Sequence, residues 1–161
     1  MDFSRNNDRS DAKKLLLLAI LAGKTMLKNG AETYRAEDTI ERICKSRFGI
    51  KYADAFATPT GIFASLEFEG EIITYLIRVK STKIDLNKIN LLNEFSREFV
   101  NSNISVDEGL AKLRSISKIN NYNMLIKSLF GSLASAFFSL LFGGTILDFI
   151  SSYLVSLVVL I

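Results

Sequence analysis

Residues 62–79 have the sequence IFASLEFEGEIITYLIRV, which predicts two antiparallel strands joined by a tight turn. In the first half, apolar side chains occupy every second position, as in a half-buried strand: Ile62, Ala64, Leu66 and Phe68. The second half repeats this period with Ile73, Tyr75, Ile77 and Val79. Glu69-Gly70-Glu71 supplies the turn between them. A weaker pattern over residues 51–58 adds a preceding strand, so we expect a three-stranded antiparallel meander.

Two helical patterns precede the expected strands. An apolar run follows Lys13-Lys14 and continues with helical spacing to Asn29-Gly30, a favourable helix stop. The basic pair imitates a secretory signal, but nearby acidic residues and the lack of a small-residue cleavage site favour a helix, either buried or packed on a membrane surface. From Ala36 to Phe48, apolar residues recur every three or four positions. The opposite face carries charge pairs four residues apart, Asp38 with Arg42 and Glu41 with Lys45.

Two more helices are expected after the strands. Asp85 has the position of an N-cap before an apolar stripe that ends near Phe99. Ser105 and Glu108 form a capping-box pattern before a further helix. Residues 1–122 are therefore predicted to form one α+β head with a three-stranded antiparallel sheet and about four helices. Residues 120–123 are expected to be the hinge that follows it.

The distribution of charge indicates a membrane segment over residues 123–161. All 20 Lys and Arg residues lie at or before Lys127, and residues 128–147 carry no charge. Such a run is long enough to cross a bilayer as a helix. Asp148 interrupts it before a further uncharged stretch reaches Ile161, so we expect one complete transmembrane helix and a truncated second one. Basic residues that flank a span stay on the cytoplasmic side, which predicts a cytoplasmic head at the inner (plasma) membrane.

Composition excludes several classes of function. The chain has no His and one Cys, Cys44, so an intramolecular disulfide, the usual zinc ligand sets and ordinary hydrolase triads cannot form. Cys44 lies at a core-facing helical position and is predicted to be a buried thiol. The net charge is +3, but basic and acidic residues are interleaved, which argues against nucleic-acid binding. We expect no metal and no cofactor.

Three clusters in the head are candidate binding residues. The first lies at a helix start and comprises Glu32, Thr33, Arg35, Glu37 and Asp38. The second is the turn Thr58-Pro59-Thr60-Gly61, which contains the only proline of the chain. The third consists of Arg78, Asp85 and Lys88. Each also has a purely structural interpretation, as a charged first turn, a strand connection, and a strand end with a helix cap. We expect the first two clusters to lie close together and form the principal polar site of the head.

The order of these motifs resembles the threonine/serine exporter family. The matching residues are Gly30-Ala31-Glu32-Thr33, Arg35, Glu37-Asp38-Thr39, Glu41-Arg42-Ile43, Thr58-Pro59-Thr60-Gly61-Ile62, Arg78-Val79, Asp85-Leu86-Asn87-Lys88, Phe142-Gly143-Gly144 and Asp148. The resemblance covers nearly the whole chain. It is to the N-terminal part that fused members share with the larger subunit of two-component members.

This resemblance implies a component of a secondary transporter that exports threonine and serine, or small dicarboxylates in some two-component relatives. It also implies that further helices are supplied by a small partner subunit or a missing C-terminal half, with a homo-oligomer as the expected assembly. The head could instead sense a ligand or direct assembly. An enzyme is the remaining alternative, because the family's head has been regarded as hydrolase-like, but no nucleophile, base and orienting group have suitable spacing.

Asp148 is the only charged residue after Lys127. A carboxylate that faces lipid is costly, so Asp148 should face a protein interior, an aqueous path or the outer interface. In one interpretation it binds a proton or a polar solute in the assembled transporter. In the other, Gly143-Gly144-Thr145 is an outer turn and Asp148 lies beside it among the headgroups.

Overall fold

The computed structural model describes residues 3–47, 49–119 and 123–160, with side chains from Arg9 onward in the first helix. The chain divides into two compact units, Met1–Ile119 and Asn120–Ile161, which are described separately. The first unit contains α1 (Phe3–Lys28), α2 (Thr33–Lys45), β1 (Ile50–Thr58), β2 (Gly61–Phe68), β3 (Glu71–Arg78), α3 (Leu86–Asn101) and α4 (Val106–Lys118). The second contains α5 (Met124–Leu141) and α6 (Ile146–Leu160).

The three strands form the predicted antiparallel meander, in the order β1-β2-β3. Ala55 lies opposite Ala64, which in turn lies opposite Tyr75. The turn between β2 and β3 places Glu69 and Gly70 in the left-handed region, with φ angles of 51° and 80°. Such paired positive φ values match the twist of a two-residue hairpin turn. The α+β class and the strand pattern are thus confirmed.

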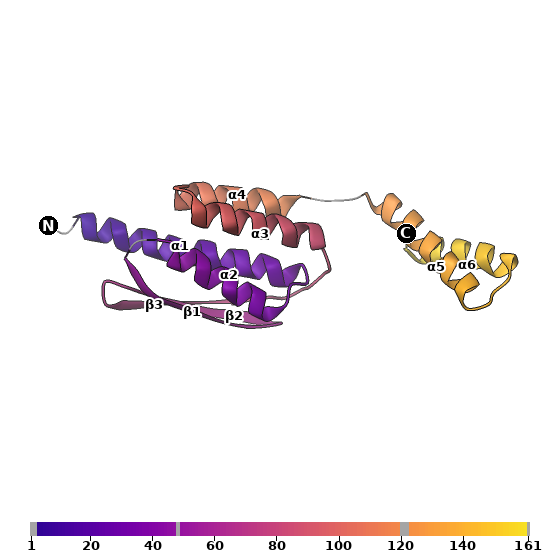
Figure 1. Cartoon of the computed structure of the whole chain (residues 1–161), viewed down its shortest axis with the longest axis horizontal. Helices are drawn as coiled ribbons and strands as arrows, with labels where there is room; N and C mark the ends of the chain where they lie inside the picture. The colour runs from indigo at the N-terminus through magenta and orange to yellow at the C-terminus, as the bar shows by residue number, and fades with distance from the viewer. Residues whose placement is uncertain (1–2, 48, 120–122, 161) are drawn as a thin grey trace. The chain divides into compact units, whose positions relative to one another are not determined.

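The first unit has three layers, in which α1 and α2 lie between the sheet and the pair α3 and α4 (Figure 1). Most of the α1 surface is consequently buried: its residues Leu15, Leu16, Leu18, Ala19, Ile20, Ala22 and Met26 are at most 1% exposed, whereas a narrow face with Lys14, Leu17, Leu21 and Lys24 is only half-buried. A helix with so wide an apolar surface requires cover from more than one layer. The apolar run after Lys14 is therefore the central helix of this unit, and the membrane-surface alternative is wrong.

The sheet has one covered and one open face. Ala57 and Ile62 point toward the helices and are buried. On the other face, Phe56, Phe63 and Leu76 form one row across the three strands, and all three side chains are exposed. The alternation that predicted the strands therefore holds for the covered face, while the open face mixes large apolar and polar residues.

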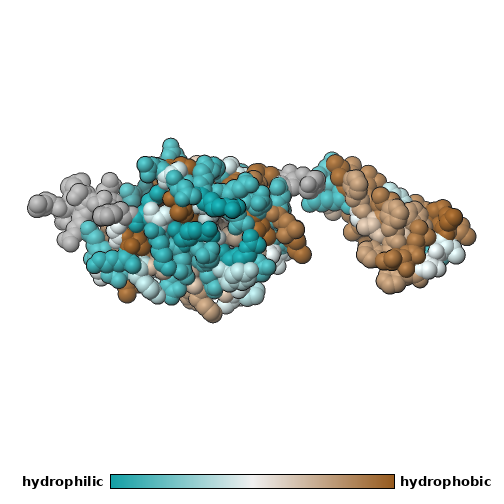
Figure 2. Space-filling view, viewed as in Figure 1, coloured by the Kyte–Doolittle hydropathy of each residue, from teal (hydrophilic) through white to brown (hydrophobic). Residues whose placement is uncertain are grey.

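The second unit is a hairpin of two apolar helices. The uncharged run 128–147 does not form one helix, because α5 ends at Leu141 and α6 begins at Ile146. Gly143 has a φ of 85°, and the amide of Gly144 donates to the carbonyl of Ser139 at 2.9 Å, a Schellman-type helix end. Figure 2 shows apolar side chains across the visible face of this unit. The hinge expected at 120–123 lies outside the described residues except for Asn123, which caps α5 by accepting from the amide of Leu125.

Gly30 joins α1 to α2 with a φ of 92°, and an added Cβ would lie 3.3 Å from the carbonyl oxygen of Lys83. Gly70 also has positive φ, but a Cβ there would meet nothing within 4 Å. Gly70→Ala should cost about 1–2 kcal/mol through the left-handed conformation alone. Gly30→Ala should cost more, because Lys83 must also move. Urea unfolding of both variants measures this difference, and equal losses of stability would contradict it.

Candidate functional site

The motifs at one end of the first unit are joined by backbone hydrogen bonds. The amide of Asp85 donates to the carbonyl of Asn29 at 3.0 Å, which ties the start of α3 to the turn after α1. The amide of Val79 donates to the carbonyl of Thr60 at 2.9 Å, which ties the end of β3 to the turn between β1 and β2. Segments more than fifty residues apart in sequence, 29 and 85, therefore meet here.

Glu37 connects the helix-start cluster directly to the sheet. The amide of Ala57 donates to Glu37 Oε1 at 2.7 Å. Ala57 precedes Thr58, so the first turns of α2 lie against the strand that leads into the threonine turn. The expected proximity of these two clusters is thus supported by a specific contact, while their role in binding stays a prediction.

The threonine turn, residues 58–61, forms side-chain hydrogen bonds within itself. Thr58 Oγ1 donates to the carbonyl of Gly61 at 3.2 Å and lies 3.4 Å from Thr60 Oγ1. Pro59 and Thr60 are exposed. Arg78 lies opposite Gly61 in the sheet register and is also exposed. These contacts fit the structural interpretation of the turn.

Asp85 is the N-cap of α3, as predicted, and accepts from the amide of Lys88 at 3.1 Å. The side chain of Lys88 lies elsewhere: it is buried, and its Nζ donates to the carbonyl of Ser117 in the last turn of α4 at 3.0 Å. An ammonium at a helix C-terminus is favourable, because orphan carbonyls lie there. Burial lowers the pKa of Lys88, and repulsion from Lys83 adds to this effect.

A polar groove of about 270 Å³ lies between α2 and α3. It is lined by Arg35, Asp38, Thr39 and Arg42 of α2 and by Asn93 and Arg97 of α3. Arg42 Nη2 donates to Asp38 Oδ2 at 2.6 Å, as the predicted pair four residues apart, and Arg35 Nη1 lies 3.6 Å from Glu32 Oε2. Sequence reasoning missed Asn93 and Arg97, although their spacing of four on the polar side of a helix was visible.

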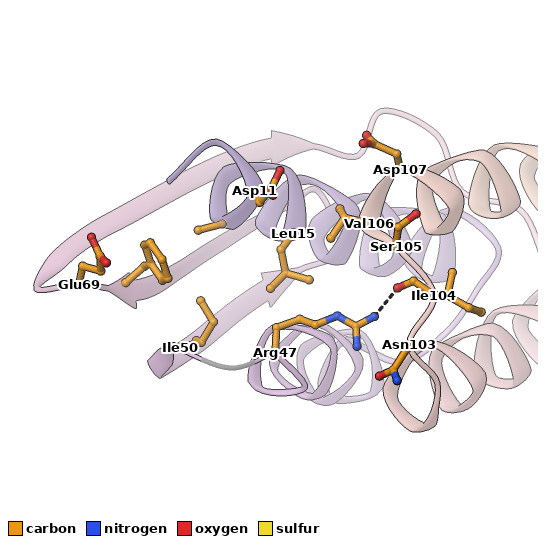
Figure 3. Close-up of a pocket in the computed structure, with 13 residues that line it drawn as sticks. Asp11, Leu15, Arg47, Ile50, Glu69, Asn103, Ile104, Ser105, Val106 and Asp107 are labelled. Atoms are coloured by element: carbon orange, nitrogen blue, oxygen red, sulfur yellow. Dashed lines mark hydrogen bonds between the residues drawn. The ribbon is translucent and has the colours of Figure 1, made fainter. Parts of the chain in front are cut away.

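A larger cavity of about 760 Å³ lies at the other end of the first unit (Figure 3). Its arginine, Arg47, donates to the carbonyl of Ile104 at 2.6 Å and lies 4.2 Å above the ring of Phe99. Arg47 thereby holds the connection between α3 and α4, where backbone carbonyls need donors.

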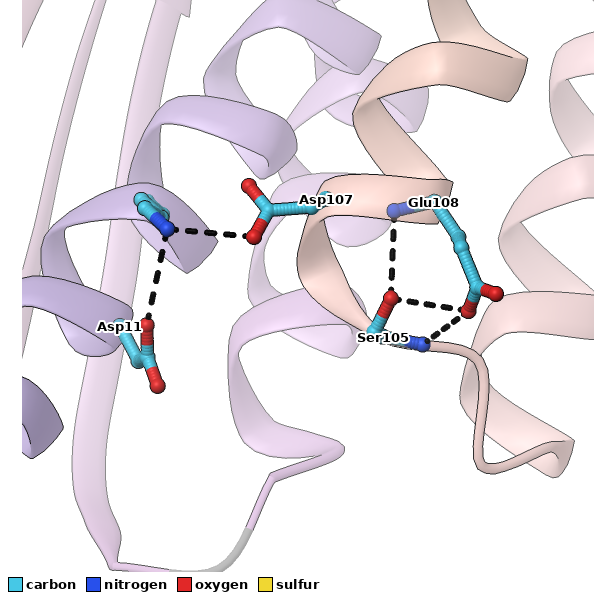
Figure 4. Close-up of polar contacts among 5 residues, drawn as sticks. Asp11, Ser105, Asp107 and Glu108 are labelled. Atoms are coloured by element: carbon cyan, nitrogen blue, oxygen red, sulfur yellow. Dashed lines mark hydrogen bonds and ion pairs between the residues drawn. The ribbon is translucent and has the colours of Figure 1, made fainter.

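The rim of this cavity is also occupied by structural contacts (Figure 4). Lys14 lies between two carboxylates, 3.2 Å from Asp107 and 3.9 Å from Asp11. Ser105 and Glu108 form the predicted capping box, which is confirmed with both reciprocal hydrogen bonds. The polar groups of this end therefore stabilise the fold.

Cys44 is fully buried, as predicted, and burial raises the pKa of its thiol to about 12. The thiol consequently stays protonated near neutral pH and is a poor nucleophile. Among the described residues, no group of three His, Cys, Asp or Glu side chains is placed to hold a metal ion.

Asp148 caps α6. The amide and hydroxyl of Thr145 donate to Asp148 Oδ2 at 2.7 and 2.8 Å, and the amide of Asp148 lies 3.3 Å from Thr145 Oγ1. This reciprocal pattern is a capping box with Asp148 at the third helical position. It fits the interpretation in which Asp148 lies beside a turn, and a role in proton or solute binding stays a prediction.

The chain combines an α+β unit with a hairpin of apolar helices, which fits a membrane-associated class of protein, and one described helix, α5, is by length and composition apolar enough to cross a bilayer. The model of the family described as "Putative threonine/serine exporter" matches residues 17–161, and the chain belongs to this family. This confirms the resemblance seen in its motifs. Comparison with curated proteins found no match. Comparison with solved structures also found none.

Glu37→Ala should leave the amide of Ala57 without its acceptor, at a cost of about 1–3 kcal/mol in the free energy of unfolding. Glu41→Ala is the control, because the one partner of Glu41 within the described ranges is Lys45 on the same helix, a contact worth about 0–1 kcal/mol. Chemical denaturation of both variants measures the two costs. Equal small losses would show that the contact between α2 and β1 contributes little.

Proposed function

We propose that this chain is one component of a secondary transporter that exports threonine and serine, with small dicarboxylates as the other candidate solutes. The observation that carries the proposal is the family match over residues 17–161, because it includes both the α+β unit and the apolar hairpin. A match confined to the first unit would have supported only a soluble relative of its fold.

The dimensions of α5 support a membrane-spanning role. Its 18 residues correspond to about 27 Å at 1.5 Å per residue, close to the roughly 30 Å of a bilayer core. Large apolar side chains such as Phe130, Phe137 and Leu141 are exposed in the described hairpin. Lipid would cover this apolar surface, whereas its exposure to water would be unfavourable.

The packing of α5 against α6 also suits a membrane. Ser128, Ser132 and Ala136 recur every four residues on α5 and are its buried residues. Small side chains at this spacing allow helices to approach closely, which favours association where the hydrophobic effect is absent. Ser156 Oγ donates to Ser135 Oγ at 2.8 Å, and Ser128 Oγ donates to the carbonyl of Leu160 at 2.7 Å.

The charge pattern supports a cytoplasmic location for the first unit. Lys112, Arg114, Lys118 and Lys127 all precede or begin α5, and no basic residue follows. Basic flanks are retained on the cytoplasmic side during insertion. The N-terminal end of α5 would then face the cytoplasm at the inner membrane.

Two helices cannot surround a path for a polar solute, because part of the path would be lined by lipid. We therefore infer that further helices come from a small membrane subunit, from a C-terminal half, or from additional copies in a homo-oligomer. The first unit would serve as a ligand-sensing or assembly domain of this transporter.

A hydrolase is the less favoured alternative. Cys44 is buried and protonated, the chain has no His, and the hydroxyl of Thr58 donates to a backbone carbonyl of its own turn. The Cys44 thiol and the Thr58 hydroxyl are therefore poorly suited to act as nucleophiles, and no histidine is available as their base.

Cells that lack this chain should release preloaded labelled threonine and serine more slowly, and re-expression should restore the rate. Phe130→Arg should fail to restore it, because a charge near the middle of α5 costs about 2.5–3.5 kcal/mol on insertion. Phe130→Leu is the matched control and should restore efflux. Efflux that is independent of this chain would contradict the proposed function, whereas labelled succinate released in its place would identify dicarboxylates as the solute.

Asn103→Cys places a reactive thiol in the exposed connection between α3 and α4, while buried Cys44 stays unreactive. A membrane-impermeant maleimide should label this variant only after cells are permeabilised. Unmodified protein, which carries Cys44 alone, is the control for background labelling. Labelling in intact cells would place the first unit outside and reject the proposed orientation.

A further inference from the structure

The groove between α2 and α3 carries more positive charge than its folding role requires. Arg35 and Arg42 come from α2 and Arg97 comes from α3, whereas Asp38 is the only carboxylate among the described residues that line the groove. Like charges brought together around one small cavity repel each other. The apolar face of α2, which includes Ala36, Ile40 and Ile43, provides its packing elsewhere. Helix packing alone therefore gives no reason to place three guanidinium groups here.

Much of the hydrogen-bonding capacity of these arginines is unused. Arg97 Nε donates to the carbonyl of Asn93 at 3.3 Å, and within the described parts of the chain its terminal nitrogens have no acceptor. Arg35 has one partner among the described residues, Glu32, at the ion-pair distance of 3.6 Å and on the surface. Arg42 donates to Asp38, but its buried Nε has no partner within the same residues. Each guanidinium has five N–H donors, so most of these donors are available for hydrogen bonds to an anion.

We propose that this groove binds a small solute through a carboxylate group. A planar carboxylate accepts two parallel hydrogen bonds from one guanidinium, and this geometry is the reason that arginine is preferred at such sites. Asp38 at the same groove disfavours ligands of high negative charge, such as a phosphate dianion. A volume of about 270 Å³ lies just below the range of about 300–1,000 Å³ for drug-sized ligands, so the solute is a small metabolite.

The site lies within the first unit, and its occupancy does not depend on transport through the second. Thr39 and Asn93 add neutral polar groups beside the arginines, which suits a solute with a second polar end. Two sources share this chemistry, a free dicarboxylate and an α-amino acid. Their binding can be compared with the same protein preparation.

The test is calorimetric titration of the full chain in detergent with sodium succinate and, separately, with L-threonine at constant ionic strength. Inorganic phosphate and chloride are titrated in parallel. Arg97→Gln should weaken binding of the carboxylate about tenfold or more, the loss expected for a hydrogen bond to a charged group. Arg114→Gln removes the same charge from an exposed position on α4 outside the groove and should bind as the unmodified protein does.

Arg35→Gln is a second variant and should weaken binding in the same way, because it changes the opposite wall of the groove. Thermal unfolding followed by circular dichroism shows that each variant is folded before it is titrated. Binding of succinate or threonine that both groove variants weaken supports the site and identifies the source of the carboxylate. Three results would overturn it: no binding of either compound at millimolar concentration, binding by phosphate alone, or equal weakening by Arg114→Gln.

Discussion

Burial of α1 from two sides is the constraint on which the rest of the first unit depends. Residues 15–26 present apolar side chains over most of the helix surface, apart from a narrow half-buried face that includes Lys24, and no single layer could cover them. The sheet covers one side and α3 with α4 covers the other, while α2 packs alongside (Figure 1). Removal of this much apolar surface from water is the main favourable term available to a domain of this size.

The three-layer arrangement also determines where polar groups can gather. Connections leave the layers at two ends, where backbone groups need partners that the helices and strands do not supply. At one end Arg47 binds the carbonyls of the α3–α4 connection, and at the other Lys88 binds the last turn of α4. Both cations therefore serve the fold, whereas the arginines between α2 and α3 are left with free donors.

The family match covers both units, but the two units are stabilised in different ways. The first unit folds by removing an apolar core from water. The second exposes large apolar side chains and packs through small ones, which is the pattern expected where lipid is the solvent. The seam of Ser128, Ser132 and Ala136 is the clearest sign of this difference.

Local features were determined by the sequence alone. The alternation around Ile62 and Leu66, the cap at Asp85, the box of Ser105 with Glu108 and the hairpin turn at Gly70 each depend on residues close together in the chain, where backbone geometry fixes the outcome. The apolar run after Lys127 is equally visible in the sequence, whereas a turn at Gly143 is only one of two interpretations that the sequence allows. The tertiary structure decided that the Lys88 ammonium donates to the last turn of α4, that Glu37 accepts from the amide of Ala57, and that Arg97 and Arg35 line one groove. Such contacts join distant segments, and they depend on how whole helices pack around α1, which no local pattern encodes.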